Sequence, residues 1–335
     1  MKAAIGIDPG RSTTKVVAHI PDGEDFRIAK FMFPSAACQA KAVATHASRQ
    51  DAQSATVIVN GEAYWVGQTA VWQGRYDPND ALHDQWFFSQ GHLALARYAY
   101  ERCIKEFGEQ MKDAEIAVGL PSRTFAADRE RYSAHLQSAF PRQIITVLPQ
   151  AVGPFYAAAM NADGTDRPTS EFEFAAQYGM IEIGHHTTDL VMLQNAVPQE
   201  DTYVSAVGMY SAAESLIRLM SRKSVTLDLR TASQAIETGV YKRFGTDVSC
   251  REEVSLVARE LAGKILATAR TTFGHEVDNC RAILVAGGGA PLCGPYLLEH
   301  WPHTILVEDA RFAVAEGFAR FAHLCATLDG APEAA

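Results

Sequence analysis

A ten-residue stretch near the start of the chain, DPGRSTTKVV at 8–17, returns in modified form as EIGHHTTDLV at 182–191, a constant offset of 174 positions. Both copies lie in apolar, β-forming surroundings and contain turn-forming residues, so each predicts a tight turn between two strands. The matched residues are Asp8, Gly10, Thr13, Thr14, Val16 and Val17 in the first copy and Glu182, Gly184, Thr187, Thr188, Leu190 and Val191 in the second. The repeat predicts two related halves that face one shared ligand.

The length of the chain also favours two domains. At 335 residues it exceeds the size at which a single hydrophobic core usually stops growing. Residues 163–174 are polar and contain proline, which is typical of a linker. We therefore expect a first domain of residues 1–162 plus 310–335, a linker at 163–171 and a second domain of residues 172–309.

Composition narrows the class of protein. Apolar residues make up 47% and charged residues 21% of the chain, as in ordinary globular proteins. The formal charge of -9 argues against direct binding of nucleic acid or of an anionic membrane. Six scattered cysteines without a C-x-x-C pair indicate reduced thiols. With neither a signal peptide nor an apolar stretch of about 20 residues, we expect a cytoplasmic protein without a membrane partner.

Periodicity predicts mixed helices and strands in both halves. The Asn-Gly pair between two apolar runs at 55–66 predicts a β-hairpin. Residues 36–55 have weak periodicity and are expected to form a surface segment. Strands are expected at 114–120, 143–149 and 281–286, and helices at 92–108, 126–140, 150–162, 211–222, 231–244, 251–273 and 311–325.

The repeated turns have the chemistry of a phosphate-binding site. Tight turns of small residues direct several backbone N–H groups toward one point, which suits phosphate oxygens. The hydroxyls of Ser12, Thr13 and Thr187 would add donors, and Lys15 would add a positive charge. A purely structural hairpin remains the alternative for either copy.

Two further features fit a nucleotide. Asp8 and Glu182 stand where a carboxylate could hold Mg²⁺ through water, although either could instead cap its own turn. The run Gly287, Gly288, Gly289 follows an apolar strand and would let the backbone approach a flat ligand closely. It has neither the G-x-G-x-x-G nor the Walker spacing, and a tight strand-to-helix crossing is the alternative.

Taken in order, these motifs resemble those of the actin-like ATPases. The set is D-x-G-x-x-x-x-K at Asp8 to Lys15, Pro149-Gln150 before a helix, E-I-G-x-x-T-T-D from Glu182, and A-G-G-G-A around Gly288. The TTK and TTDLV segments are most similar to the ParM/StbA plasmid-segregation branch. The resemblance implies an α/β, actin-like (ribonuclease H-like) fold with two related domains around a nucleotide cleft.

The resemblance also implies roles for individual residues. Gln150 would orient the attacking water and, with Asp8 and Glu182 at the metal, form the catalytic set. An uncharged amide suffices because the transition state is loose and catalysis rests on positioning. The nucleotide would be bound by Gly10, Arg11, Ser12, Thr13 and Lys15 of the first loop, Gly184, His185, His186 and Thr187 of the second, Gly287, Gly288 and Gly289 beside the adenosine, and Gln234 near the sugar.

Three positions depart from the family pattern. Relatives usually have Asp where Glu182 stands, often Gly-Gly in place of His185-His186, and often a small hydroxyl residue in place of Arg11. We do not expect the two histidines to form a metal site, because neighbours in a strand point to opposite faces. The departures leave nucleotide binding expected and the rate of turnover open.

The expected function is an ATPase that binds ATP (or GTP) with Mg²⁺ and polymerises into filaments. The resemblance implies a DNA-binding adaptor protein as partner, so that filament growth separates plasmids or other replicons. A small-molecule kinase or a chaperone-type nucleotide switch are the alternatives. A kinase would need a general base near its acceptor, and Asp189 is the one candidate we identify.

Overall fold

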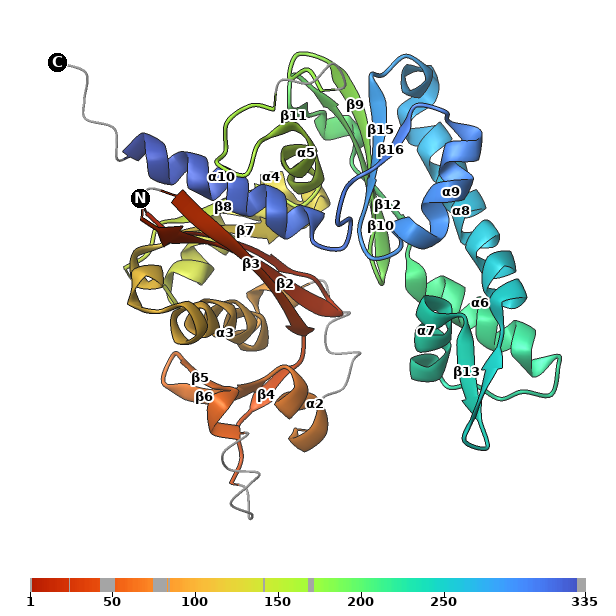
Figure 1. Ribbon diagram of the computed structural model, residues 1–335, viewed down its shortest axis with the longest axis horizontal. Helices are drawn as coiled ribbons and strands as arrows, with labels where there is room; N and C mark the ends of the chain where they lie inside the picture. The colour runs from red at the N-terminus through yellow and green to blue at the C-terminus, as the bar shows by residue number, and fades with distance from the viewer. Residues whose placement is uncertain are drawn as a thin grey trace. The chain divides into compact units, whose positions relative to one another are not determined.

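The computed structural model describes residues 2–23, 25–42, 52–74, 83, 85–140, 142–167 and 172–329 (Figure 1). The chain divides into two compact units. Unit 1 consists of Met1–Ser170 and Phe312–Ala335, and unit 2 consists of Glu171–Arg311. Each unit has its own hydrophobic core around its own mixed sheet.

The sheet of unit 1 has the strand order β3-β2-β1-β7-β8. Strand β2 is antiparallel to both of its neighbours, β1 and β3, while β1, β7 and β8 are parallel. The strands are β1 (Ala4–Pro9), β2 (Thr13–Asp22), β3 (Asp25–Pro34), β7 (Glu115–Leu120) and β8 (Ile145–Pro149). Every residue of β1 and β7 is buried, as expected for parallel strands covered on both faces.

The sheet of unit 2 repeats this arrangement. Its order is β11-β10-β9-β15-β16, with β12 also paired to β10, and β9, β15 and β16 are parallel. The strands are β9 (Gln177–Ile183), β10 (Thr187–Gln194), β11 (Val197–Pro198), β12 (Val204–Val207), β15 (Ala282–Ala286) and β16 (Thr304–Leu306).

The sequence repeat is also a repeat of strand register. In unit 1, Asp8 lies opposite Lys15, and in unit 2 the matched Glu182 lies opposite the matched Asp189. The two predicted hairpins are therefore confirmed. Each is formed by the first two strands, along the chain, of the main sheet of its unit.

Helices cover both faces of the unit 1 sheet (Figure 1). Successive residues of a strand point to opposite faces, so Val16 faces the core that includes α3, while Val17 packs against Ala315 and Ala319 of α10. The helices are α3 (Gln90–Phe107), α4 (Ser122–Gln137), α5 (Val152–Ala159) and α10 (Ala313–Asp329). As predicted, α3 stops at Gly108, which has a φ of 99°.

A small second sheet belongs to unit 1. It contains β4 (Ala37–Gln39), β5 (Thr56–Val59) and β6 (Glu62–Val66), followed by α2 (Gln68–Gln73). The predicted Asn60-Gly61 turn is confirmed, with φ of 51° and 82°. Strand β4 lies in the segment 36–55, where we expected a surface segment of weak periodicity, and residues 43–51 of that segment lie outside the described residues.

In unit 2 one predicted helix is wrong at its C-terminal end. The helices are α6 (Met209–Ser221), α7 (Leu229–Thr238), α8 (Arg251–Phe273) and α9 (Ala290–His300). We expected a helix through 231–244, but Gly239 adopts a left-handed conformation and ends α7. The chain then forms the hairpin β13 (Val240–Arg243) and β14 (Thr246–Ser249) around Phe244 and Gly245, both with positive φ.

Short 3-10 helices complete the described elements: η2 (Trp86–Phe88), η3 (Glu109–Asp113), η4 (Glu200–Thr202) and η5 (Gly274–Asp278). All six cysteines are free thiols, and burial raises the pKa of Cys293 to about 12. Across the described part of the chain, every helix is too short or too polar to cross a membrane.

Candidate functional site

The first turn places a buried carboxylate between two partners. Asp8, at the end of β1, is 3% exposed. Its Oδ2 accepts a hydrogen bond from Lys15 Nζ at 2.9 Å, and its Oδ1 accepts one from Gln150 Nε2 at 2.9 Å. A buried charge requires such pairing to offset the loss of hydration. Residues singled out from two separate motifs thus lie together in unit 1.

The sheet order explains how Gln150 reaches Asp8. Strands β1, β7 and β8 are parallel neighbours, so their carboxyl ends lie at one edge of the sheet. Gln150 follows β8 directly, and its backbone N–H donates to the carbonyl of Leu120 at 2.9 Å. Its side chain must cross the end of β7 to meet Asp8.

Ser35 holds the first turn in place from the end of β3. Its hydroxyl donates to the carbonyl of Gly10 and lies 2.8 Å from the hydroxyl of Thr14, while its N–H donates to the carbonyl of Ser12 at 3.0 Å. Within the turn, Ser12 is exposed and Thr13 is half-buried. Sequence reasoning missed Ser35, because its partners are more than 20 positions away and no local pattern marks it.

Arg11 lies against η2. Its guanidinium donates to the carbonyl of His83 at 3.3 Å and stands 5.8 Å and 5.2 Å from the ring centroids of Trp86 and Phe87. Such cation–π contacts give a long, charged side chain a stable position beside the turn. The aromatic pair therefore accommodates the arginine that replaces a small residue in this loop.

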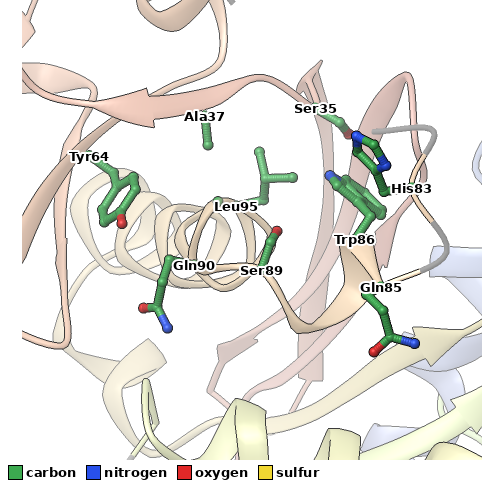
Figure 2. Close-up of a pocket in the computed structure, with 10 residues that line it drawn as sticks. Ser35, Ala37, Tyr64, His83, Gln85, Trp86, Ser89, Gln90 and Leu95 are labelled. Atoms are coloured by element: carbon green, nitrogen blue, oxygen red, sulfur yellow. The ribbon is translucent and has the colours of Figure 1, made fainter. Parts of the chain in front are cut away.

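A pocket of about 380 Å³ lies next to the first turn, between the small sheet and the start of α3 (Figure 2). It is lined by Ser35, Ala37, Tyr64, His83, Gln85, Trp86, Ser89, Gln90, Gly91 and Leu95. The described residues of its lining include no Asp, Glu, Lys or Arg side chain and none of the predicted phosphate-loop residues. The pocket was not predicted from sequence.

In unit 2 the second turn is fastened to the start of α6. The carbonyls of Gly184, His185 and His186 accept hydrogen bonds from three successive backbone N–H groups at 208–210, at 2.7–3.1 Å. Neither histidine has a positive φ, so the backbone of this loop does not require the glycines common in relatives.

The two histidine rings pack together with Tyr210. His186 stacks on the Tyr210 ring at 5.7 Å, and the rings of His185 and His186 meet edge to face at 4.7 Å. Burial lowers the pKa of His185 below its usual value. Burial thus favours the neutral form of the His185 imidazole.

The glycine run approaches the second turn closely. Gly287 has a φ of 89°, and a Cβ there would lie 2.4 Å from the carbonyl oxygen of Ile183 and 2.6 Å from Glu182 Oε1. The N–H of Gly289 donates to the same Ile183 carbonyl at 3.0 Å. Only glycine fits at 287. The structure thus brings Glu182 and the predicted adenosine loop together within unit 2.

Helix α7 connects to this glycine loop through an ion pair. Arg311 donates to Glu237 at 2.9 Å, and Arg311 Nε lies 3.8 Å from the position of a Cβ at Gly288. Gln234 is exposed and lies one turn before Glu237 on the same helix. Neither Arg311 nor Glu237 was predicted, since the ion pair joins residues 74 positions apart.

Neither Asp8 in unit 1 nor Glu182 in unit 2 belongs to a preformed metal cluster of described residues. Among the residues that the structure describes, no cluster of three or more His, Cys, Asp or Glu side chains could hold a metal. Mg²⁺ is commonly bound by one or two carboxylates, waters and the phosphates of its nucleotide. Since Lys15 and Gln150 already engage both oxygens of Asp8, that carboxylate fits contact with the ion through water.

Comparison with protein families assigns most of the chain. Residues 6–153 match the family described as "Actin like proteins N terminal domain", and residues 180–299 match "Archaeal actin homologue MreB-like, C-terminal". No curated protein sequence matches the chain.

Solved structures of the same architecture cover nearly the whole chain. A 15-stranded ParM filament from Clostridium botulinum matches with a TM-score of 0.72 and 18% identity over 96% of this chain and 99% of that one. The actin-like protein Alp7A gives a TM-score of 0.72 and 16% identity over 98% of both chains. The ADP complex of Ta0583, an archaeal actin homolog, gives 0.69 and 20% over 97% and 100%. The predicted two-domain α/β fold is confirmed.

Proposed function

Because the chain belongs to the actin-like superfamily, we propose that it is an ATPase that binds ATP with Mg²⁺ and polymerises into filaments. The observation that supports this most strongly is the buried Asp8, which accepts hydrogen bonds from Lys15 and from Gln150. Asp8 begins the turn of unit 1 whose sequence is repeated in unit 2. The likeness to an ADP-bound actin homolog supports nucleotide binding, and the likeness to a ParM filament supports self-association.

In this proposal the two repeated turns bind the phosphates. Backbone N–H groups of residues 11–13 and 185–187 donate to phosphate oxygens, and Lys15 supplies a positive charge. The N–H groups of Gly10 and Gly184 donate within their own turns, to the carbonyls of Asp8 and Thr187. The backbone of Gly287–Gly289 lies against the adenosine, with Gln234 near the sugar. Asp8 and Glu182 would hold Mg²⁺ through water, and the ion would neutralise part of the phosphate charge.

Gln150 orients the attacking water. Its Nε2 donates to Asp8, which fixes the orientation of the amide and leaves Oε1 as the acceptor for a proton of the water. No strong base is needed, because the phosphoryl transition state is loose and depends mainly on position and charge. Asp8 therefore has two roles, at the ion and in aligning Gln150.

We further propose that the filaments move plasmids or similar replicons through a DNA-binding adaptor protein in the cytoplasm. The formal charge of -9 supports an adaptor, because an acidic chain has no general attraction for DNA. The kinase alternative is less well supported. Its candidate base, Asp189, accepts a hydrogen bond from Ser205 on the paired strand β12, at 2.6 Å.

The test is to add ATP and Mg²⁺ to the purified protein and to follow light scattering, sedimentation and phosphate release together. We expect assembly followed by phosphate release, and no assembly with ADP. A parallel series with GTP determines the preferred base. Gln150→Ala should still assemble but release phosphate on the order of 100-fold more slowly. Gln110→Ala, which removes an exposed amide from η3, is the matched control. Flat scattering with no phosphate release would contradict the proposal.

A further inference from the structure

Gly119 is an unexpected residue for its place in the fold. It lies in β7, a fully buried strand between β1 and β8. Glycine destabilises a strand interior, and it usually marks a place where another group approaches closely. Its φ is not positive, so the backbone at this position accepts any residue. The reason for glycine must be the space beside it.

Two side chains occupy that space. A Cβ at Gly119 would lie 2.8 Å from Phe318 Cε2 and 2.9 Å from Gln150 Cγ, both closer than carbon atoms approach without a clash. Phe318 comes from α10 and is fully buried. The Gln150 side chain continues past this point to Asp8, where its amide donates the 2.9 Å hydrogen bond. The Gln150 side chain therefore crosses β7 directly over Gly119.

The backbone of α10 does not account for this glycine. Where α10 approaches its neighbours, the atoms in the way are backbone: a Cβ at Gly6 would lie 2.0 Å from the carbonyl oxygen of Ala315, and one at Gly153 would lie 2.7 Å from Val314 Cα. At Gly119 the three nearest atoms belong to side chains, those of Phe318 in α10 and of Gln150.

We propose that Gly119 is a positioning residue for Gln150. Because it has no side chain, it leaves space over β7 for the Gln150 side chain, and Phe318 packs beside that space. The inference rests on the proposed function, in which Gln150 orients the attacking water. A methyl group at 119 displaces Gln150 Cγ and takes the amide away from Asp8. Nucleotide binding is unaffected, because Gly119 belongs to neither phosphate loop nor to the glycine loop.

The experiment compares single-turnover phosphate release and ATP affinity in four proteins: wild type, Gly119→Ala, Gln150→Ala and the double variant. We expect Gly119→Ala to lower the rate constant on the order of 100-fold, as a displacement of about 1 Å can do, with the ATP dissociation constant unchanged within about twofold. The double variant should be no slower than Gln150→Ala alone, since Gly119 acts only through Gln150.

Gly179→Ala is the matched control. Gly179 lies in β9, a central strand of unit 2, and its Cβ would meet Ile283 and Phe273 at an ordinary 3.5 Å. It should leave phosphate release at the wild-type rate. Should Gly119→Ala fail to fold, Gln150→Asn tests the same reach, because its amide is one methylene too short to cross β7 to Asp8. It should be as slow as Gln150→Ala.

The outcomes separate this inference from the proposed function. Wild-type protein that releases no phosphate refutes the ATPase proposal. If the wild type is active, three results would overturn the role of Gly119 without affecting the ATPase proposal. These are a full rate for Gly119→Ala, a full rate for Gln150→Asn, or a double variant whose rate is lowered by the product of the two single effects. A readout independent of turnover is the side-chain amide NMR signal of Gln150, which should shift in Gly119→Ala and stay in place in Gly179→Ala.

Discussion

Replacing Asp8 by Asn tests whether the first turn depends on a buried ion pair. The two side chains have the same shape, and Asn Oδ1 can still accept the hydrogen bond from Gln150. In the wild type, the Asp8 Oδ2 atom accepts a hydrogen bond from Lys15 Nζ at 2.9 Å. In the variant, the Asn amide nitrogen takes the place of that oxygen and directs an N–H group at Lys15 Nζ. The substitution thus removes one charge-assisted hydrogen bond and leaves two donors facing each other.

The size of the effect follows from burial. Asp8 is buried and Lys15 retains 16% of its side-chain exposure, so water can only partly replace the lost interaction. A hydrogen bond to a charged group contributes about 1.5–3 kcal/mol, so we expect the free energy of unfolding of unit 1 to fall by about 2–3 kcal/mol. For a unit of this size that corresponds to a fall in Tm of about 5–10 °C.

The assay is urea unfolding followed by circular dichroism, in a double-mutant cycle with Lys15→Met. Because the two residues interact, we expect a coupling free energy of about 2 kcal/mol. Glu260→Gln is the matched control, since Glu260 pairs with Lys264 at 2.7 Å on the exposed face of α8 and should cost about 0.5 kcal/mol or less. A loss for Asp8→Asn as small as that of the control, or a coupling near zero, would refute the reasoning.

Three further predictions concern stability. Phe244→Asn should raise the free energy of unfolding of unit 2 by about 0.5–1 kcal/mol in urea titration, because Phe244 is 96% exposed and held at a φ of 50° that suits Asn better. An unchanged or lower midpoint would contradict this. Gly287→Ala should lower the free energy of unfolding of unit 2 by at least about 2 kcal/mol, because the residue has a φ of 89° and an added Cβ would clash with Glu182. An unchanged free energy would show that the glycine loop is not fixed against the second turn. Burial lowers the pKa of His19 to about 3. Since the unfolded state then binds more protons, stability is complete above about pH 6.5 and falls as the pH drops toward 3, by about 1.4 kcal/mol per pH unit for this group. In urea titrations at several pH values, His19→Phe should reduce that slope by the contribution of one proton. An unchanged slope would show that His19 does not cause the pH dependence.

The parts of the fold that sequence predicted are those set by local or repeated patterns. The two copies of the turn predicted a hairpin in each half, and in the structure both hairpins have the same register. Asn60-Gly61 predicted its turn, and Gly108 predicted the end of α3. Each of these signals lies within a few residues of the feature that it determines.

The parts that sequence did not predict depend on residues far apart. The helix expected through 231–244 failed because Gly239 was taken as a helical residue, although in the left-handed conformation it ends a helix. The contacts of Ser35 with the first turn and of Arg311 with Glu237 join distant positions. No local pattern marks Gly119, because the side chains that pack over it come from positions 150 and 318.

The most direct test of the account is a crystal structure of the protein with Mg²⁺ and a non-hydrolysable ATP analogue. We predict that residues 11–13 and residues 185–187 both donate backbone N–H groups to its phosphates, with Gly287–Gly289 against the adenosine. A nucleotide bound to one turn only, or bound elsewhere, would contradict the claim that the repeated turns form one phosphate site.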